Sequence, residues 1–404
     1  MIVYFSTAHR VSSTLADRQN LPRKARRNFP GLFRQKRATL NHAPIRRKKQ
    51  TGGVFLQDTK EPRPLLAGLF RGLLLLAALM MTALSLVPRA AAAEPQPRMV
   101  IPLGQAVGIK LFSQGVLVVG LTDITTEQGL ASPAKACGIR TGDVITHIND
   151  SQVSSIEEVQ TILQDLNGRE MELNVLREEE QLELTTRAAQ CSADGAYKLG
   201  AWIRDSMAGI GTLTFVEPAT GLFGTLGHGI NDVDTSVLMK LQTGAITPAS
   251  VVGIVKGMDG RPGELRGAFT AGEDLGKLFA NTQQGVFGYL TENDTFTGTP
   301  IPVAEPEEVR EGKATILSNV EGTQVEEYAV EIIKICHNAT DTRDLMLKVT
   351  DQRLLDKTGG IVQGMSGSPI IQNGKLVGAV THVLVNDPTR GYGIFIENML
   401  DVAR

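Results

Sequence analysis

A serine in a glycine-rich turn is the feature of this chain with the clearest chemical meaning. Gly364-Met365-Ser366-Gly367-Ser368-Pro369 leads directly into an apolar run that starts at Ile370. Glycine lets a chain turn tightly, so the backbone N–H groups of Gly364 and Ser366 can point at one developing oxyanion. The pattern indicates a serine nucleophile, Ser366, with its oxyanion hole. The alternative is a glycine-rich turn that only leads into a strand.

A candidate general base lies upstream, at His228 in Gly227-His228-Gly229. A serine hydroxyl is a poor nucleophile until a base takes its proton, and histidine can do so near neutral pH. A histidine that precedes the serine by about one small domain is the chain order of chymotrypsin-like proteases. The apolar run Gly374–Thr381 that follows the serine reads as a buried strand, and in such enzymes it forms a wall of the substrate cleft.

The remaining histidines and cysteines suggest no second chemistry. The cysteines, Cys137, Cys191 and Cys336, are too few for a disulfide framework, and no spacing suggests a metal or another cofactor. Cys336-His337 lacks a glycine-rich oxyanion setting, so we expect a buried cysteine at a strand end. His382 is expected to be a cleft-wall or core residue rather than the base.

Charge is distributed unevenly along the 404 residues, although the net charge is only −2. Residues 1–64 hold 15 Lys and Arg but 3 Asp and Glu, whereas the remainder has a net charge of −14. The basic block precedes Leu65–Val87, an apolar run long enough to cross a bilayer as a helix, so we expect contact with a membrane and not with nucleic acid. The positive flank predicts a cytoplasmic N-terminus and an exported remainder.

The role of this segment in the mature protein is open. Ala90-Ala91-Ala92-Ala93 offers a signal-peptidase site, so residues 65–87 are either an uncleaved anchor, which we favour, or a long signal peptide. Residues 1–64 are either a disordered tail or lie before the true start of the protein. Residues 88–100 are expected to form a linker. The sequence does not give the oligomeric state.

Residues 101–190 contain the helix-capping and turn residues expected of a small α+β domain. Ser155 and Glu158 form a capping box that opens a helix with apolar residues at helical spacing, including Val159. Residues 171–177 and 181–187 alternate like the two strands of a hairpin. The segment resembles a bacterial PDZ domain; the matching stretches are Val107-Gly108-Ile109, Gly115-Val116-Leu117-Val118, Ser132-Pro133-Ala134, Ala136-Cys137-Gly138-Ile139, Gly142-Asp143-Val144-Ile145 and Ile148-Asn149.

PDZ domains bind an extended peptide as an added strand beside a helix. The resemblance places the carboxylate-binding loop near Val107, Gly108 and Ile109, and the groove helix at residues 155–166 with Val159 facing the peptide. The alternative is a vestigial groove, with the domain only packing against its neighbour.

Residues 196–404 differ from the preceding segment in their glycine content and in the length of their apolar runs. They hold 28 of the 42 glycines, and short apolar runs recur between the turns. This pattern predicts a mainly β domain, and about 200 residues suit a chymotrypsin-like double β-barrel with its active site between the barrels.

Here the chain resembles the SpoIVB peptidase family of endospore-forming bacteria. The resemblance rests on Thr358–Pro369, Val380–Val383, Asn386–Gly393 and the histidine motif Leu226–Ile230. It also rests on the order of anchor, PDZ domain and peptidase. It implies a serine endopeptidase that cleaves itself and then a membrane-bound regulator of an intramembrane protease, which matures a late sigma factor. The implied location is the space between forespore and mother cell.

The resemblance implies Ser366 as nucleophile, His228 as base and Asp351 as the acid that orients the base. Asp351 also reads as an ordinary residue at a helix start, and Asp232, Asp234 and Asp274 remain alternatives. A second class of function stays open, a non-catalytic PDZ scaffold with a degenerate peptidase. A quality-control protease of the HtrA type is disfavoured, because its PDZ domain usually follows the protease.

Overall fold

The computed structural model describes residues 72–77, 80, 97–269, 273–337, 339 and 341–403. Residues 97–404 fall in one compact unit. Residues 72–77 and 80 are helical, and no helix within the described ranges is long and apolar enough to cross a membrane. Most of the expected span 65–87, the basic segment 1–64 and the expected linker up to residue 96 lie outside the described residues.

The first barrel is closed by one strand with two partners. Its hydrogen-bonded order is β12-β14-β15-β11-β10-β1, and β1 pairs again with β12. Strand β13 (Glu264–Phe269) pairs with β12, and β16 (Ile301–Pro302) pairs with the start of β1. The barrel strands are β1 (Met99–Leu121), β10 (Ala201–Val216), β11 (Leu222–Thr225), β12 (Leu241–Val255), β14 (Gly276–Thr282) and β15 (Gly285–Leu290).

The second barrel is closed in the order β17-β18-β19-β22-β21-β20. Alternation sets its core: on β18, Tyr328, Val330 and Ile332 are buried, while the residues between them face outward. Helix α4 (Gln352–Thr358) precedes the serine turn, a short 3-10 turn η1 (Pro306–Glu308) precedes β17, and helix α5 (Ile396–Val402) ends the described chain. The barrel strands are β17 (Gly312–Glu321), β18 (Gln324–Ile335), β19 (Leu345–Val349), β20 (Pro369–Gln372), β21 (Lys375–Val383) and β22 (Arg390–Phe395).

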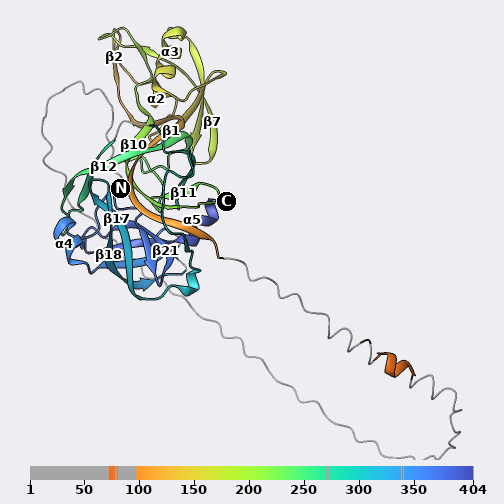
Figure 1. Cartoon of the computed structure of the whole chain (residues 1–404). Coiled ribbons are helices and arrows are strands. Elements are labelled where there is room, and N and C mark those ends of the chain that lie inside the picture. The colour runs from red at the N-terminus through yellow and green to blue at the C-terminus, as the bar shows by residue number, and fades with distance from the viewer. Residues whose placement is uncertain are drawn as a thin grey trace, which may run out of the picture. The chain divides into compact units, whose positions relative to one another are not determined.

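The PDZ domain lies between β1 and β10 in the chain, and both strands run from it into the first barrel (Figure 1). Ser155 and Glu158 form the predicted capping box of its helix α3, and Asn167 ends that helix in the left-handed conformation. The elements of the domain are β2 (Ile124–Thr126), β3 (Gly129–Ala131), α2 (Pro133–Ala136), β4 (Val144–Ile148), β5 (Ser151–Gln152), α3 (Ile156–Leu166), β6 (Glu170–Arg177), β7 (Glu180–Arg187), β8 (Ala189–Gln190) and β9 (Tyr197–Lys198).

The expected start of the PDZ domain at residue 101 is wrong. Val107 and Ile109 are buried in the first barrel, where they pair with Gly211 and Gly209 of β10 on one side and with β12 on the other. Strand β1 enters the PDZ domain only after Gly115, beside an irregularity in its register with β10. One strand continues through both domains, and at the boundary only Ser113-Gln114-Gly115 interrupts its apolar residues.

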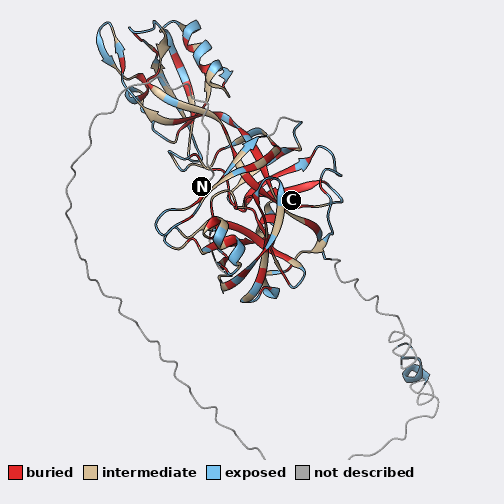
Figure 2. Ribbon diagram, turned by 60° about the vertical axis from the view of Figure 1, so that its left-hand side comes forward, coloured by how far each residue is buried: buried red, intermediate tan, exposed pale blue. Residues whose placement is uncertain are grey.

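Buried residues follow the strands of all three bodies, while the outer surfaces of the helices are exposed (Figure 2). The PDZ domain and the two barrels each have a hydrophobic cluster, and a further cluster joins the barrels. In that joining cluster Phe215 and Phe287 of the first barrel pack with Ala379, Ile394 and α5 of the second. The apolar contact holds the barrels together where the serine and histidine turns meet.

Candidate active site

The serine turn connects α4 to β20 in the second barrel. Gly364 and Gly367, on either side of Ser366, have φ of 98° and 96°, in the left-handed region that favours glycine. Gly367 donates a 2.7 Å hydrogen bond to the Val380 carbonyl, and Ser368 is buried with its hydroxyl 3.1 Å from that of Ser318. Ser368 is therefore a structural neighbour, while Ser366 is half-buried at the turn.

Thr212 of β10, in the first barrel, binds this turn through two hydrogen bonds. The Thr212 N–H donates to the Ser366 carbonyl at 3.2 Å, and its hydroxyl donates to the Gly364 carbonyl at 2.7 Å. A Cβ atom on Gly367 would lie 2.1 Å from the Thr212 carbonyl oxygen and 2.6 Å from the Leu226 nitrogen. Leu226 stands two residues before His228, so this close approach brings the turns of the predicted base and nucleophile together from different barrels.

The predicted oxyanion donors are available. Within the described ranges, the N–H groups of Gly364 and Ser366 donate no hydrogen bond to the protein. The Ser366 hydroxyl does not point at a histidine: it donates a 2.6 Å hydrogen bond to the carbonyl oxygen of Thr381 on β21. In this arrangement the nucleophile is held by a backbone acceptor.

His228 is held in the tautomer that a base requires. Its Nδ1 lies 2.9 Å from the Gly229 carbonyl oxygen, and a carbonyl only accepts, so Nδ1 carries the proton. Nε2 is then the bare nitrogen, and it is buried without a hydrogen-bond partner. Burial lowers the pKa of His228 to about 3, with the neighbouring His382 adding to the lowering and the bond to Gly229 opposing it.

His382, expected on the cleft wall or in the core, lies next to His228. The two ring centroids are 5.1 Å apart, and Nδ1 of His382 is buried without a partner. Both rings line a polar cavity of about 530 Å³. Asp341 and Arg343 line it too, as part of a loop whose Thr342 carbonyl accepts a 2.9 Å hydrogen bond from the Thr381 hydroxyl.

The structure does not place Asp351 against the base. Asp351 is the N-cap of α4, and its carboxylate accepts hydrogen bonds from Ala329 N and Arg353 N at 3.2 and 3.0 Å and pairs with the Arg353 guanidinium. This is the helix-start role that the sequence left open. The Arg353 hydrogen bonds, against a smaller effect of burial, lower the pKa of the Asp351 carboxyl.

The alternative acids have other surroundings as well. Asp232 and Asp234 both pair with Arg204 of β10, and Asp274 is an exposed residue two positions before β14. Asp341 and Asp401 are the carboxylates that line the cavity beside His228. Neither was selected by sequence, because their approach depends on how the 341–343 loop and α5 pack against the barrel.

The peptide groove of the PDZ domain is also built differently from expectation. Residues 201–204 of β10 pair with Leu121–Leu117 of β1, and their opposite edge pairs with no strand in the described part of the chain. Helix α3 packs beyond this edge, and Asp205 accepts a 3.0 Å hydrogen bond from Ile156 N at its first turn. The open edge is therefore on β10.

The residues predicted for peptide binding do not line that edge. Val107, Gly108 and Ile109 belong to the first barrel, as described above. Val159 is 2% exposed and packs in the PDZ core with Val118, Ile145 and Leu173. A charge at Val159 would disrupt the fold of the domain instead of testing its groove.

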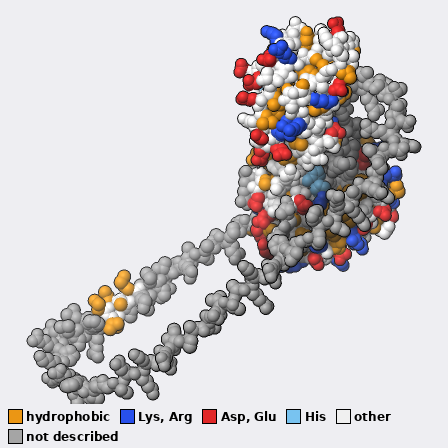
Figure 3. Space-filling model, turned by 180° about the vertical axis from the view of Figure 1, so that it is seen from behind, with side chains coloured by type: hydrophobic (Ala, Val, Ile, Leu, Met, Phe, Trp, Pro, Cys, Tyr) orange, Lys and Arg blue, Asp and Glu red, His pale blue; other side chains and the backbone are white. Residues whose placement is uncertain are grey.

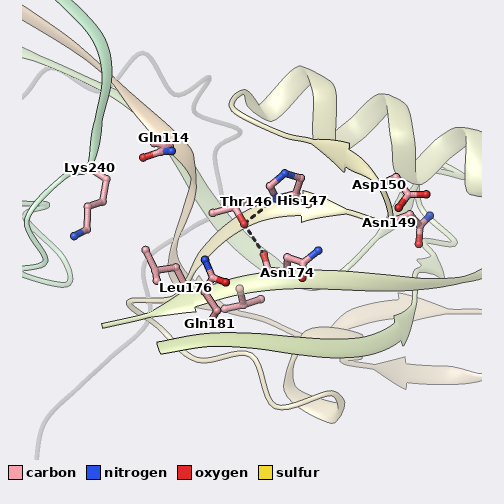
Figure 4. A pocket seen from close by; sticks show the side chains of 10 residues that line it. Gln114, Thr146, His147, Asn149, Asp150, Asn174, Leu176, Gln181 and Lys240 are labelled. Atoms are coloured by element: carbon pink, nitrogen blue, oxygen red, sulfur yellow. Dashed lines mark hydrogen bonds between the residues drawn. The ribbon is translucent and has the colours of Figure 1, made fainter. Parts of the chain in front are cut away.

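A second cavity, of about 580 Å³, is lined mainly by polar side chains of the PDZ sheet and by Lys240 (Figure 4). His147 and Asn174 line it from the PDZ sheet, Gln114 from β1 and Lys240 from the segment before β12. Thr146 links its two neighbours, with its hydroxyl 3.1 Å from His147 Nδ1 and 3.2 Å from the Asn174 carbonyl. The face of the molecule seen in Figure 3 mixes acidic and basic side chains over the PDZ domain.

Comparison with known proteins assigns both domains. The model of the SpoIVB peptidase S55 family matches residues 195–400, about half of the 404-residue chain, and a PDZ-domain model matches residues 125–177. A search of curated proteins gives no match. The family is one of serine peptidases, which agrees with a serine and a histidine turn that meet between two β-barrels. The chain belongs to the SpoIVB peptidase S55 family and is a serine endopeptidase with a PDZ domain.

Proposed function

We propose that Ser366 is the nucleophile, that His228 is its general base, and that Gly364 and Ser366 N–H form the oxyanion hole. The observation that carries the proposal is the contact of the two turns through Thr212, Leu226 and Gly367. Two further observations support it. Nε2 of His228 carries no proton in the tautomer described above and has no hydrogen-bond partner. The N–H groups of Gly364 and Ser366 donate no hydrogen bond within the described residues.

The reaction would begin with release of the Ser366 hydroxyl from Thr381. An extended substrate that donates a backbone N–H to the Thr381 carbonyl would replace the serine there, and the hydroxyl would turn toward His228 Nε2. Oγ then attacks the scissile carbonyl carbon while Nε2 takes its proton, and the oxyanion is bound by the two N–H groups. The protonated His228 returns the proton to the leaving amine, and water then releases the acyl group.

For the biological role, we propose that the enzyme acts in endospore formation. It would be tethered to the membrane by residues 65–87 and exported into the space between forespore and mother cell. It would cleave itself and then a membrane-bound regulator of an intramembrane protease. Support comes from the family match and from the apolar segment after a basic block. The alternative, a non-catalytic PDZ scaffold, is less well supported, because the family is one of serine peptidases.

The test is the intact mass of the purified full-length chain followed over hours, wild type against Ser366→Ala and His228→Gln. Ser192→Ala, at an exposed serine of the PDZ domain, is the matched control. We expect the wild type and the control to trim themselves while the two active-site variants stay whole. Self-cleavage by folded Ser366→Ala would show that the nucleophile is another residue.

A further inference from the structure

Two neighbouring charged residues on β10 reach two different parts of the molecule. Asp205 accepts a hydrogen bond from the first turn of α3, at the groove of the PDZ domain. Arg204 pairs with Asp232 and Asp234, the latter at 2.8 Å between Nη2 and Oδ2. Asp232 lies four residues after His228, so Arg204 reaches the loop that follows the proposed base.

This loop is a small hairpin, residues 228–239, which we call the His228 hairpin. Met239 N donates to the Ile230 carbonyl at 3.0 Å, and Asp232 N donates to the Val237 carbonyl at 2.8 Å. Asn281 of β14 fixes the base of the hairpin, since its side chain accepts from Ile230 N at 2.8 Å and donates to the Ile230 and Met239 carbonyls. The tip needs a separate attachment.

Asp232 organises the tip from inside. Its side chain is 0% exposed, and its Oδ1 accepts from Asp234 N, Thr235 N and the Thr235 hydroxyl at 2.9–3.1 Å. The other carboxylate oxygen faces the Arg204 guanidinium. Removing a carboxylate from water is costly unless a cation and hydrogen bonds replace the water, so the buried tip depends on the contact with Arg204.

The same strand also touches the nucleophile. Eight residues after Arg204, Thr212 holds the Ser366 and Gly364 carbonyls, as described above. Strand β10 thus contacts the serine turn through Thr212, the His228 hairpin through Arg204 and the groove helix through Asp205. Its segment 201–206 has one unpaired edge within the described chain, which is the edge that an added peptide strand would use.

We propose that Arg204 is a positioning residue for catalysis: it fixes the tip of the His228 hairpin to β10, and so couples the orientation of the base to the PDZ groove strand. The inference rests on the assignment of His228 and Ser366 proposed above. An extended peptide that adds to residues 201–206 would order the strand segment that carries Arg204. Strand β10 would then support both the peptide groove and the hairpin that carries the proposed base.

The test compares Arg204→Met, Arg204→Lys and the matched control Arg187→Met in the purified full-length chain. Arg187 pairs with Glu170 on the PDZ surface, 68% exposed and remote from the hairpin in its contacts. The readout is the rate at which a fluorophosphonate reagent modifies Ser366, measured from about pH 5 to pH 8, with the modified peptide identified by mass.

We expect Arg204→Met to react on the order of 100-fold more slowly, because a base displaced by about 1 Å loses that much. Its acid limb should move toward the ordinary range of histidine as water reaches the ring. Arg204→Lys should recover most of the rate, and Arg187→Met should match the wild type. A folded Arg204→Met with the wild-type rate and pH profile would overturn the inference.

Two outcomes need separate handling. If wild-type Ser366 is not modified while another residue is, the nucleophile assignment fails, and not the role of Arg204. If Arg204→Met does not fold, Asp234→Ala decides, because it removes only the exposed partner. We expect a two- to fivefold slower reaction, about the worth of an exposed ion pair. No change in rate for folded Asp234→Ala would then refute the inference.

Discussion

The Ser366 hydroxyl donates a 2.6 Å hydrogen bond to the carbonyl oxygen of Thr381 on strand β21. The same carbonyl is an acceptor for the backbone of an extended substrate under the mechanism proposed above. Nucleophile and substrate therefore compete for one acceptor. Under that mechanism the enzyme rests with its serine turned away from the proposed base, and substrate binding would free the hydroxyl.

Ser366→Ala is expected to remove activity and leave the fold. The substitution deletes one hydroxyl and its bond to the carbonyl of Thr381, a fully buried residue, so it should cost about 1–3 kcal/mol of unfolding free energy, the worth of one buried acceptor left unpaired. Thermal unfolding by circular dichroism and fluorophosphonate modification, measured on the same sample, check this. A large loss of stability would show that the hydroxyl is a structural group.

Gly367→Ala is expected to be far more damaging than its chemistry suggests. The new Cβ would lie 2.1 Å from the Thr212 carbonyl oxygen, and the residue has φ of 96°. Backbone strain and overpacking together should cost about 3 kcal/mol or more. The matched control is Gly374→Ala, which has φ of 75° but open space around its Cβ and should lose only about 1 kcal/mol. Equal unfolding midpoints in urea would contradict the close contact of the turns.

Acid is expected to destabilise the folded enzyme through His228. Burial lowers the pKa of His228 in the folded state to about 3, below its ordinary value of 6.5. Below pH 6.5 the unfolded chain therefore binds a proton that the folded chain refuses. The stability that His228 contributes is complete above pH 6.5 and is lost as the pH falls toward the folded value, by about 1.4 kcal/mol per pH unit.

His228→Gln should show a shallower fall in unfolding free energy between about pH 6 and pH 4 than the wild type. Urea titrations at several pH values measure the difference. The same lowered pKa keeps the base unprotonated in mild acid, so modification of Ser366 should persist at about pH 5. An acid limb near pH 6.5 in the wild type would mean that His228 is hydrated in solution.

Asp351→Asn separates the two roles that the sequence left open for this residue. Asparagine caps a helix about as well as aspartate, so α4 should keep its start, although the charge toward Arg353 is lost. Since the carboxylate contacts Ala329 and Arg353, we expect modification of Ser366 within a few-fold of the wild type. A loss of about 10⁴ in rate, the size seen for a triad carboxylate, would return Asp351 to the catalytic unit.

Local signals in the sequence located much of this architecture. The capping box at Ser155 and Glu158 and the glycines around Ser366 act over a few residues, so their structures follow from their types. The predicted hairpin of residues 171–177 and 181–187 is β6 and β7. The family match supports the serine peptidase that the two turns suggested.

What the sequence did not reveal depends on pairing across long separations. Val107 pairs with Gly211 and with Pro248, and nothing in an apolar run specifies partners more than 100 residues away. The contact of His228 with His382, and that of Arg204 with Asp232, exist only once the barrels and the PDZ domain have packed. For the same reason, Asp351 was placed in the catalytic unit by resemblance, while its local role as an N-cap was visible from its neighbours.

The placement of the PDZ domain between β1 and β10 has a consequence for folding. These strands pair Ile109 with Gly209, so forming this pair in the first barrel requires joining segments about 100 residues apart. A PDZ domain that folds first aligns Leu117 with Arg204, so that only the remaining pairs of β1 and β10 have to form next to an existing one. This removes most of the entropy cost of loop closure. We therefore expect the domain to act as a folding template for the enzyme in which it is inserted. A peptide that stabilises the PDZ fold would then also raise the fraction of peptidase that reaches its native state.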